Sequence, residues 1–151
     1  MRGTSSRLDE NCRFCSFARG KEQAPIIFED EISLGFLDQR PLFPGHCLVI
    51  PKEHYPTLVD LPGPLLAPFF ASVQLVARAV ERAMNAEGTF VAANNRVSQS
   101  IPHLHFHVVP RRNRDGLRGF FWPRQKYADQ QAIETVQSSI RLAIAKIQSE
   151  R

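Results

Sequence analysis

The sequence predicts an α+β fold in which a mainly antiparallel sheet of about five strands is combined with two helices. Five short segments have the length and the apolar or alternating pattern of strands, and two longer segments carry apolar residues at helical spacing. The connections between the strand segments are mostly too short for the crossover that a parallel pair needs. These observations place the chain in the α+β class.

Three strands are expected in the first third of the chain. Residues 26–29 and 32–37 predict two strands joined by a tight turn. A loop rich in proline and glycine follows over residues 37–45. Residues 47–50 form a wholly apolar run of strand length, closed by Pro51.

A helix is expected from Pro64 to about Ala86. Proline fits only the first turn of a helix, so Pro64 or Pro68 marks its start, and Gly88 marks its end. Apolar residues cover more than one stripe of this helix, which leaves a surplus off the main face. That surplus comprises Leu66, Phe70 and Leu75.

Two further strands and a second helix complete the expected fold. Residues 89–93 predict the fourth strand, and residues 103–109 predict the fifth. Asp129 is placed to cap the last helix. The apolar face of that helix would consist of Ile133, Val136, Ile140, Ile144 and Ile147.

The fifth strand segment reads His-Leu-His-Phe-His-Val-Val. Successive side chains of a strand point to opposite faces, so His103, His105 and His107 would share one face while the apolar residues dock on a core. Histidine has an unperturbed pKa near neutrality. Three on one face indicate a metal site, proton transfer, or nucleophilic attack on phosphorus or carbon. A loop rich in asparagine and serine precedes them and is suited either to closing over a phosphate or to forming an ordinary turn.

Two cysteines near the N-terminus have the spacing of half a metal site. Cys12 and Cys15 form a C-x-x-C motif, which alone is compatible with redox chemistry, metal binding or neither. A tetrahedral zinc site needs four nitrogen or sulfur ligands. Two histidines from elsewhere in the chain would have to complete it.

Length, charge and cysteine content bound the remaining possibilities. The 151 residues suffice for one core, and we expect a flexible leader over residues 1–11 and a single domain over 12–151. The leader lacks the apolar region of a secretory signal, and no run of about 18 apolar residues predicts a membrane span. Three cysteines favour a reduced, cytoplasmic setting over a disulfide scaffold. The net charge of +4 suits an anionic small substrate and also weak contact with nucleic acid.

The order of motifs closely resembles the histidine triad family of nucleotide hydrolases and transferases. The resemblance covers about residues 12–111 and implies the histidine triad fold and a homodimer. One departure is Ser98, where many members of the family have glycine. The motifs that carry the resemblance are the C-x-x-C, Phe36-Leu37-Asp38, Pro44-Gly45-His46, Ile50-Pro51-Lys52-Glu53-His54 and His103 to Arg111.

The resemblance implies a covalent mechanism at the α-phosphate of a nucleotide with an AMP- or GMP-type moiety, such as a dinucleoside polyphosphate or a nucleoside phosphoramidate. His105 would be the nucleophile, with its tautomer fixed by the carbonyl of His103. His107 would contact the phosphate and assist the leaving group, and His46 would line the same pocket. The substrate-binding residues would be Phe36 at the base, Asp38 at the ribose hydroxyls, and Asn94, Gln99 and Ser100 at the phosphate, the ribose or the leaving group.

The resemblance further implies a structural zinc ion, as in a bacterial-type subgroup of the family. Its ligands would be Cys12, Cys15, His54 and His103. Four protein ligands leave no open position, so the metal would tie the N-terminal segment to the catalytic strand without entering the chemistry.

Two other classes of function remain open from the sequence. In a zinc hydrolase the three histidines would themselves bind a catalytic metal, although no acidic ligand follows His107. In a non-catalytic module for nucleotides or nucleic acid, the basic stretch 111–126 and its aromatic residues Phe120, Phe121 and Trp122, with Tyr127, would supply charges and stacking faces. An intact His105 favours the enzyme, and a nucleic-acid partner is not expected.

Overall fold

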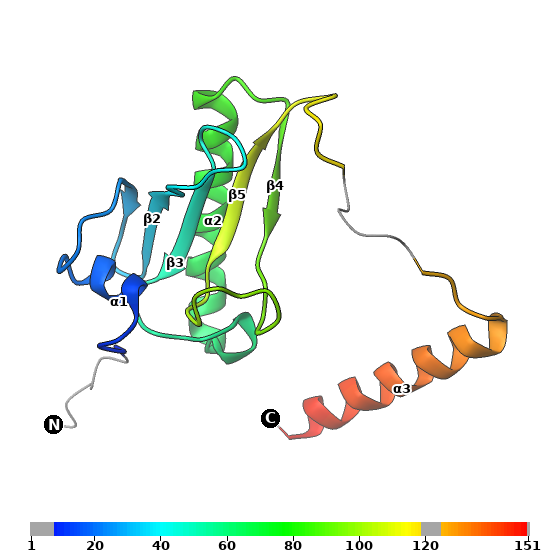
Figure 1. Cartoon of the computed structure of the whole chain (residues 1–151). Helices are drawn as coiled ribbons and strands as arrows, with labels where there is room; N and C mark the ends of the chain where they lie inside the picture. Colours follow the sequence, from blue (N-terminus) through cyan, green and yellow to red (C-terminus); the bar gives the residue numbers. More distant parts are fainter. Residues whose placement is uncertain (1–7, 119–124, 151) are drawn as a thin grey trace, which may run out of the picture. The chain divides into compact units, whose positions relative to one another are not determined.

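The computed structural model describes residues 8–118 and 125–150. These residues fall into two compact units, which divide between Asp115 and Gly116. The first unit contains a five-stranded sheet in the order β1-β2-β3-β5-β4, in which every neighbouring pair is antiparallel (Figure 1). The strands are β1 (Ile26–Glu29), β2 (Ser33–Leu37), β3 (Cys47–Pro51), β4 (Gly88–Ala92) and β5 (Phe106–Arg111). The expected antiparallel sheet is confirmed.

The described residues form three α-helices where the sequence predicted two. They are α1 (Arg13–Ala18), α2 (Gly63–Ala83) and α3 (Gln130–Ser149), with a 3₁₀ turn at Leu58–Asp60. The helix α1 was not predicted from the sequence, because its six residues are too few to show a helical period. Pro64 lies in the first turn of α2 as expected, whereas Pro68 lies inside the helix.

The helix α2 packs on one face of the sheet and forms the larger core. Its residues Phe69, Val73, Val76 and Val80 are buried against the sheet, among others against Val108. By length and composition alone α2 could cross a membrane, a test that the core helix of a globular domain also passes. Its contacts with β2, β3, β4 and β5 are those of such a core helix.

The helix α1 forms a second, smaller core on the other face of the sheet. Residues of β3 alternate between the two cores, with Val49 in the first and Leu48 in the second. Phe14 and Phe17 of α1 pack there against Phe36 of β2, with ring centroids 5.3 Å and 5.2 Å from the Phe36 centroid. Both cysteines of the C-x-x-C motif therefore belong to this smaller core.

The prediction that all three histidines lie within the fifth strand is wrong. The strand β5 begins at Phe106, because its pairing with β3 begins at Val49↔Phe106 and the backbone N–H of Leu104 donates instead to Tyr55 O, at 2.7 Å. His103 and His105 thus precede the strand, and only His107 belongs to it. The alternation of faces persists, since Leu104 and Phe106 belong to the α2 core.

The second unit contains α3. Asp129 caps it as predicted, with its Oδ1 accepting from the backbone N–H of Ala132 at 2.8 Å. The five residues of its predicted apolar face, Ile133 to Ile147, are exposed. A single domain over 12–151 stays a prediction. Residues 1–7 of the leader expected over 1–11, and the aromatic residues Phe120, Phe121 and Trp122, lie outside the described residues.

Gly45 is required by the loop that leads into β3. Its φ is +95°, and a Cβ atom there would lie 2.6 Å from Cγ of Met84. We expect Gly45→Ala to lower the free energy of unfolding by roughly 1–3 kcal/mol, because it adds both a strained backbone and a clash. Gly88 has open space around its Cβ position, so Gly88→Ala is the matched control. Denaturant titration measures both, and equal stabilities would contradict this account of Gly45.

Candidate functional site

A pocket of about 310 Å³ opens between α1, the end of β2 and the histidine segment. Its size falls at the lower end of small-molecule sites. It brings together five residues predicted from the sequence to bind or transform the substrate: Phe36, Asp38, Ser100, His105 and His107.

The ring of His105 is held in one tautomer. Its Nδ1 lies 2.7 Å from the carbonyl oxygen of His103, and a carbonyl can only accept, so Nδ1 carries the proton. The far nitrogen, Nε2, then keeps its lone pair. Phe14 packs edge-on against the ring at 5.3 Å between centroids, and His105 is only 5% exposed. His105 is therefore a buried candidate base or nucleophile on the pocket wall, because its neutral form has the lone pair on Nε2.

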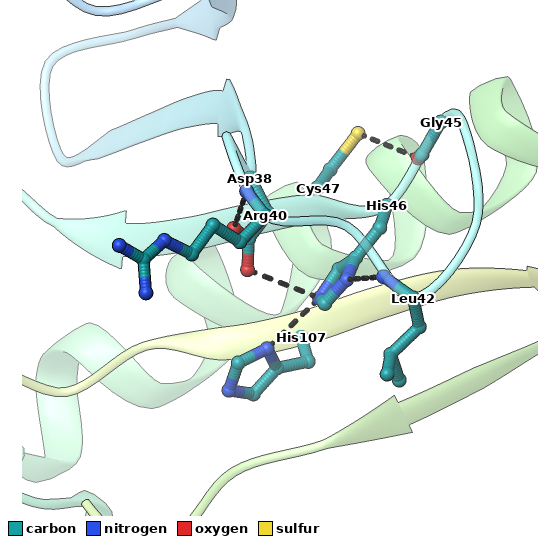
Figure 2. Close-up of polar contacts among 7 residues, drawn as sticks. All are labelled: Asp38, Arg40, Leu42, Gly45, His46, Cys47 and His107. Atoms are coloured by element: carbon teal, nitrogen blue, oxygen red, sulfur yellow. Dashed lines mark hydrogen bonds and ion pairs between the residues drawn. The ribbon is translucent and has the colours of Figure 1, made fainter. Parts of the chain in front are cut away.

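A relay of hydrogen bonds sets the tautomer of His107 (Figure 2). The backbone N–H of Leu42 donates to Nδ1 of His46 at 3.1 Å, so a neutral His46 carries its proton on Nε2. That nitrogen lies 2.9 Å from Nδ1 of His107 and 3.7 Å from Oδ2 of Asp38. His107 accordingly accepts at Nδ1 and carries its own proton on Nε2. His107 thus presents a hydrogen-bond donor beside the lone pair of His105.

Both histidines of this relay are neutral at physiological pH. Burial lowers the pKa of His107 to about 4, assisted by the nearby rings of His105 and His46. Burial also lowers the pKa of His46, although the Asp38 carboxylate opposes the shift. The site therefore supplies donors and lone pairs rather than positive charge from these two rings.

The lowered pKa of His107 predicts an acid-sensitive fold. The unfolded chain binds a proton at this residue below pH 6.5, while the folded chain resists it down to about pH 4. The free energy of unfolding should therefore fall as the pH drops through this window. His107→Asn retains an acceptor for His46. We expect its free energy of unfolding to decrease less steeply with falling pH than that of the unmodified protein. Urea titrations at several pH values measure it, and parallel curves for the two proteins would refute it.

Two amide side chains of the loop before the histidines donate to backbone carbonyl oxygens and do not line the pocket. Asn94 donates from Nδ2 to the carbonyl oxygen of Ser98 at 3.1 Å, and Gln99 donates from Nε2 to Pro56 O at 2.6 Å. Neither amide lines the pocket. Ser98 has a φ of +58°, a backbone conformation that favours glycine.

The four predicted metal ligands lie together. The sulfur and nitrogen atoms that Cys12, Cys15, His54 and His103 offer are all within 4.8 Å of one another. Cys12 Sγ lies 3.4 Å from His103 Nδ1, and Cys15 Sγ lies 3.4 Å from His54 Nδ1. A tetrahedral zinc ion with ordinary Zn–S and Zn–N bonds separates such atoms by about 3.6 Å. The donor set and the spacing therefore fit zinc.

The orientation of His103 also suits a metal ligand. Its Nε2 lies 2.8 Å from the carbonyl oxygen of Pro51, so Nε2 carries the proton and Nδ1 is left to face the cysteines. Metal-bound histidines characteristically donate their other N–H in this way. The same residue supplies the carbonyl that fixes His105, so the cluster and the candidate nucleophile share one backbone segment.

Sequence reasoning missed several residues of the pocket wall. Arg13, Phe14 and Phe17 come from α1, and Arg40 comes from the loop after β2. The sequence did contain a signal for Phe14, because this residue stands between the two cysteines. A metal bound to both cysteines would also hold the backbone of Phe14 in place. No pattern in the sequence distinguished Arg40 from the other arginines.

Comparison with known proteins identifies named relatives. The HIT domain matches residues 19–114, a range that begins after the cysteine pair. The chain is 38% identical over 115 residues to adenylylsulfatase HINT3 of Arabidopsis thaliana, covering 75% of this chain and 58% of that protein. It is 32% identical over 104 residues to the asymmetrical bis(5'-nucleosyl)-tetraphosphatase of Schizosaccharomyces pombe (68% of this chain, 56% of that protein). It is 31% identical over 121 residues to adenosine 5'-monophosphoramidase HNT1 of Saccharomyces cerevisiae (79% and 74%). The chain thus spans less than two thirds of the first two relatives.

Solved structures share the fold. SMU.412c of Streptococcus mutans superposes with a TM-score of 0.83 at 30% identity, covering 93% of this chain and 89% of that one. A zinc-bound histidine triad family protein of Mycobacterium smegmatis gives a TM-score of 0.67 at 37% identity, covering 93% and 98%. With the domain match and the triad geometry, these likenesses show that the chain belongs to the histidine triad family.

Proposed function

We propose that this protein is a nucleotide hydrolase or nucleotidyl transferase that cleaves at the α-phosphate through a covalent intermediate on His105. The observation that carries the proposal is the fixed tautomer of His105, whose Nδ1–H is held by the His103 carbonyl and whose Nε2 keeps a lone pair at the pocket. The lone pair attacks the α-phosphorus as the bond from phosphorus to the leaving group breaks. Water then attacks the same phosphorus, displaces Nε2 and releases the mononucleotide.

The other pocket residues have complementary roles in this proposal. His107 donates from Nε2 to a phosphate oxygen or to the departing group, and His46 holds it in that tautomer. Asp38 accepts from the ribose hydroxyls, Phe36 packs on the base, and Ser100 contacts the phosphate. For Gln99 and Asn94, a substrate contact would require their amides to leave the loop bonds described above.

The names of the relatives support a variable leaving group. Their substrates in name are an adenylyl sulfate, a dinucleoside tetraphosphate and an adenosine phosphoramidate. The common feature is a nucleotide α-phosphate, which is where His105 would act. Steady-state kinetics on adenylyl and guanylyl substrates with varied leaving groups tests the proposal. Failure to cleave any of them would refute it.

We further propose that the four-ligand cluster binds a structural zinc ion. The fit of the sulfur and nitrogen atoms and the zinc-bound relative from Mycobacterium smegmatis support this. Zinc there would cross-link α1 to the segment that carries His103, and with four protein ligands it would have no open position for catalysis.

A homodimer is proposed from the surface of α2. Leu66 and Phe70 are each 38% exposed and Leu75 is 50% exposed, so the surplus apolar residues do lie off the buried face. Apolar residues gathered on one helix are better buried against a partner than left in water. Light scattering at micromolar concentration should report twice the chain mass of 17.1 kDa, and a monomer would contradict the proposal.

The alternative of a catalytic metal on the three histidines finds no support in the site. His103 faces the cysteines, His105 is tied to a carbonyl, and His107 is bonded to His46 at a hydrogen-bond distance. Their ring nitrogens do not converge on one point. For the binding-module alternative, much of the basic aromatic stretch lies outside the described residues.

A further inference from the structure

Positive charge in the substrate pocket comes from two arginines. The relay histidines are neutral, because burial lowers the pKa of both His46 and His107. Arg13 and Arg40 are the cations that line the pocket, and Asp38 is the one carboxylate among its described lining residues. The two arginines differ in how that charge is balanced.

Arg13 is already neutralised locally. Its Nε lies 2.9 Å from Oε1 of Glu22, and its guanidinium lies over the ring of Phe17, 5.2 Å from the centroid. These contacts hold the side chain against α1 and supply a counter-charge. Arg13 therefore contributes less charge to an incoming substrate than its formal charge suggests.

Arg40 has no such compensation. Its backbone N–H donates to Oδ1 of Asp38 at 2.8 Å, while Figure 2 shows its guanidinium extending away from that carboxylate. Within the described residues, no carboxylate forms an ion pair with this guanidinium. Asp38 is the proposed ribose ligand, and two residues along the chain Arg40 places in the same pocket a cation without an ion-pair partner among the described residues.

A guanidinium in this position suits a second anion. Arginine binds phosphate and related oxyanions through paired N–H donors. In nucleotide sites of other folds, a carboxylate binds a free ribose hydroxyl and a nearby arginine accommodates a phosphate on the ribose. Here the Asp38 carboxylate accepts from the backbone N–H of Arg40, and both residues line the same pocket, so one loop offers both kinds of contact.

We propose that Arg40 is a specificity-determining residue that binds an anionic group, phosphate or sulfate, carried by the nucleotide substrate in addition to the scissile phosphate. The proposal rests on the proposed nucleotide hydrolase function. The second anion has two sources, a leaving group or a phosphate on the ribose. The shared chemistry is an oxyanion within reach of the Arg40 guanidinium.

Three adenylyl substrates separate these sources. Adenosine 5'-phosphoramidate lacks a second anion, adenosine 5'-phosphosulfate has an anionic leaving group, and 3'-phosphoadenosine 5'-phosphosulfate adds a ribose phosphate. The quantity to compare is kcat/KM for each anionic substrate divided by kcat/KM for the phosphoramidate. In Arg40→Gln we expect this ratio to fall by about tenfold or more, because a hydrogen bond to a charged group is lost. If the ratio falls for adenosine 5'-phosphosulfate as well as for the 3'-phosphorylated substrate, Arg40 binds the leaving group. If the ratio falls only for the 3'-phosphorylated substrate, Arg40 binds the phosphate on the ribose.

Matched variants separate a direct contact from a positional effect. Arg40→Gln keeps the backbone N–H that holds Asp38. Arg40→Lys should restore part of the ratio through its charge, and Arg78→Gln, on the exposed side of α2, should leave the ratio unchanged. A ratio that Arg40→Gln does not alter, with all substrates slowed alike or none affected, overturns the proposal.

A binding measurement separates failure of this proposal from failure of the proposed function. If the unmodified protein cleaves none of the substrates, calorimetry compares its affinities for adenosine 3',5'-bisphosphate and for adenosine 5'-phosphosulfate with its affinity for AMP. A preference for either ligand that Arg40→Gln abolishes supports the anion site although hydrolysis has failed. If neither the bisphosphate nor uncleaved adenosine 5'-phosphosulfate binds more tightly than AMP, or if Arg40→Gln leaves those preferences unchanged, the anion site is overturned.

Discussion

Replacing His105 with alanine is expected to lower turnover by roughly 10⁴-fold or more, in line with the loss of a catalytic nucleophile elsewhere. No other ring in the pocket has an unprotonated nitrogen in the same setting, because His107 Nδ1 accepts from His46 and His103 faces the cysteines. Nucleotide binding should persist, since Phe36 and Asp38 are untouched. Single-turnover kinetics and calorimetry with AMP measure the two effects separately.

The comparison variant for this experiment is His107→Asn. If His107 acts only as a hydrogen-bond donor to the phosphate or the leaving group, its loss should slow the reaction by roughly 10²–10³-fold, less than the loss of His105. Near-normal turnover by His105→Ala would end the covalent proposal. A folded His105→Ala protein that binds AMP but does not turn over excludes the trivial explanation that the pocket has collapsed.

The covalent intermediate gives a second, independent readout. A rapid quench of the unmodified protein early in turnover should trap a nucleotidyl group on the protein. Trypsin cuts after Arg96 and Arg111, so one peptide carries His103, His105 and His107. Fragmentation of that peptide after an alkaline quench should place the added nucleotidyl group on His105. A group on another residue would assign the nucleophile elsewhere.

Much of the fold could be predicted from the sequence because its elements are regular and long enough to show a period. The strands and α2 follow from apolar runs, alternation and helical spacing, and Asp129 caps α3 as its residue type suggests. The short helix α1 escaped detection, and the start of β5 was placed too early. Both errors concern features decided by tertiary contacts, namely packing of Phe14 on the sheet and the bond from Leu104 N–H to Tyr55 O.

The candidate site was predictable where a motif fixes the chemistry. The resemblance to the histidine triad family named His105 and His107, which line the pocket, and the four cluster residues, which lie together. His46 does not line the pocket as predicted but contacts His107 behind it.

Pattern alone could not show that the amides of Asn94 and Gln99 donate to the carbonyl oxygens of Ser98 and Pro56, or that Arg40 reaches the pocket. Those facts depend on loop conformation, such as the positive φ of Ser98, which a sequence does not specify.

Loss of both cluster cysteines should weaken the fold and substrate binding together. A site saturated at 1,000 times its Kd for zinc stabilises the folded chain by about 4 kcal/mol. Cys12→Ser with Cys15→Ser should therefore lower the melting temperature by roughly 8–16 °C. Because α1 also carries Phe14 and Phe17 of the pocket wall, we expect a raised KM, with kcat retained at low temperature.

Cys47→Ser is the matched control for this double variant. Cys47 is a buried thiol in the α2 core, outside the cluster, with its Sγ 3.1 Å from Gly45 O. Cys47→Ser also buries a hydroxyl. Added zinc should still raise the melting temperature of Cys47→Ser, whereas it should not raise that of the double variant. Elemental analysis of protein purified without chelators should find about one zinc per chain. If none is found and added zinc changes neither the melting temperature nor the affinity for AMP, then Cys12 and Cys15 are ordinary buried thiols, and α1 is held against the sheet by the packing of Phe14 and Phe17 alone.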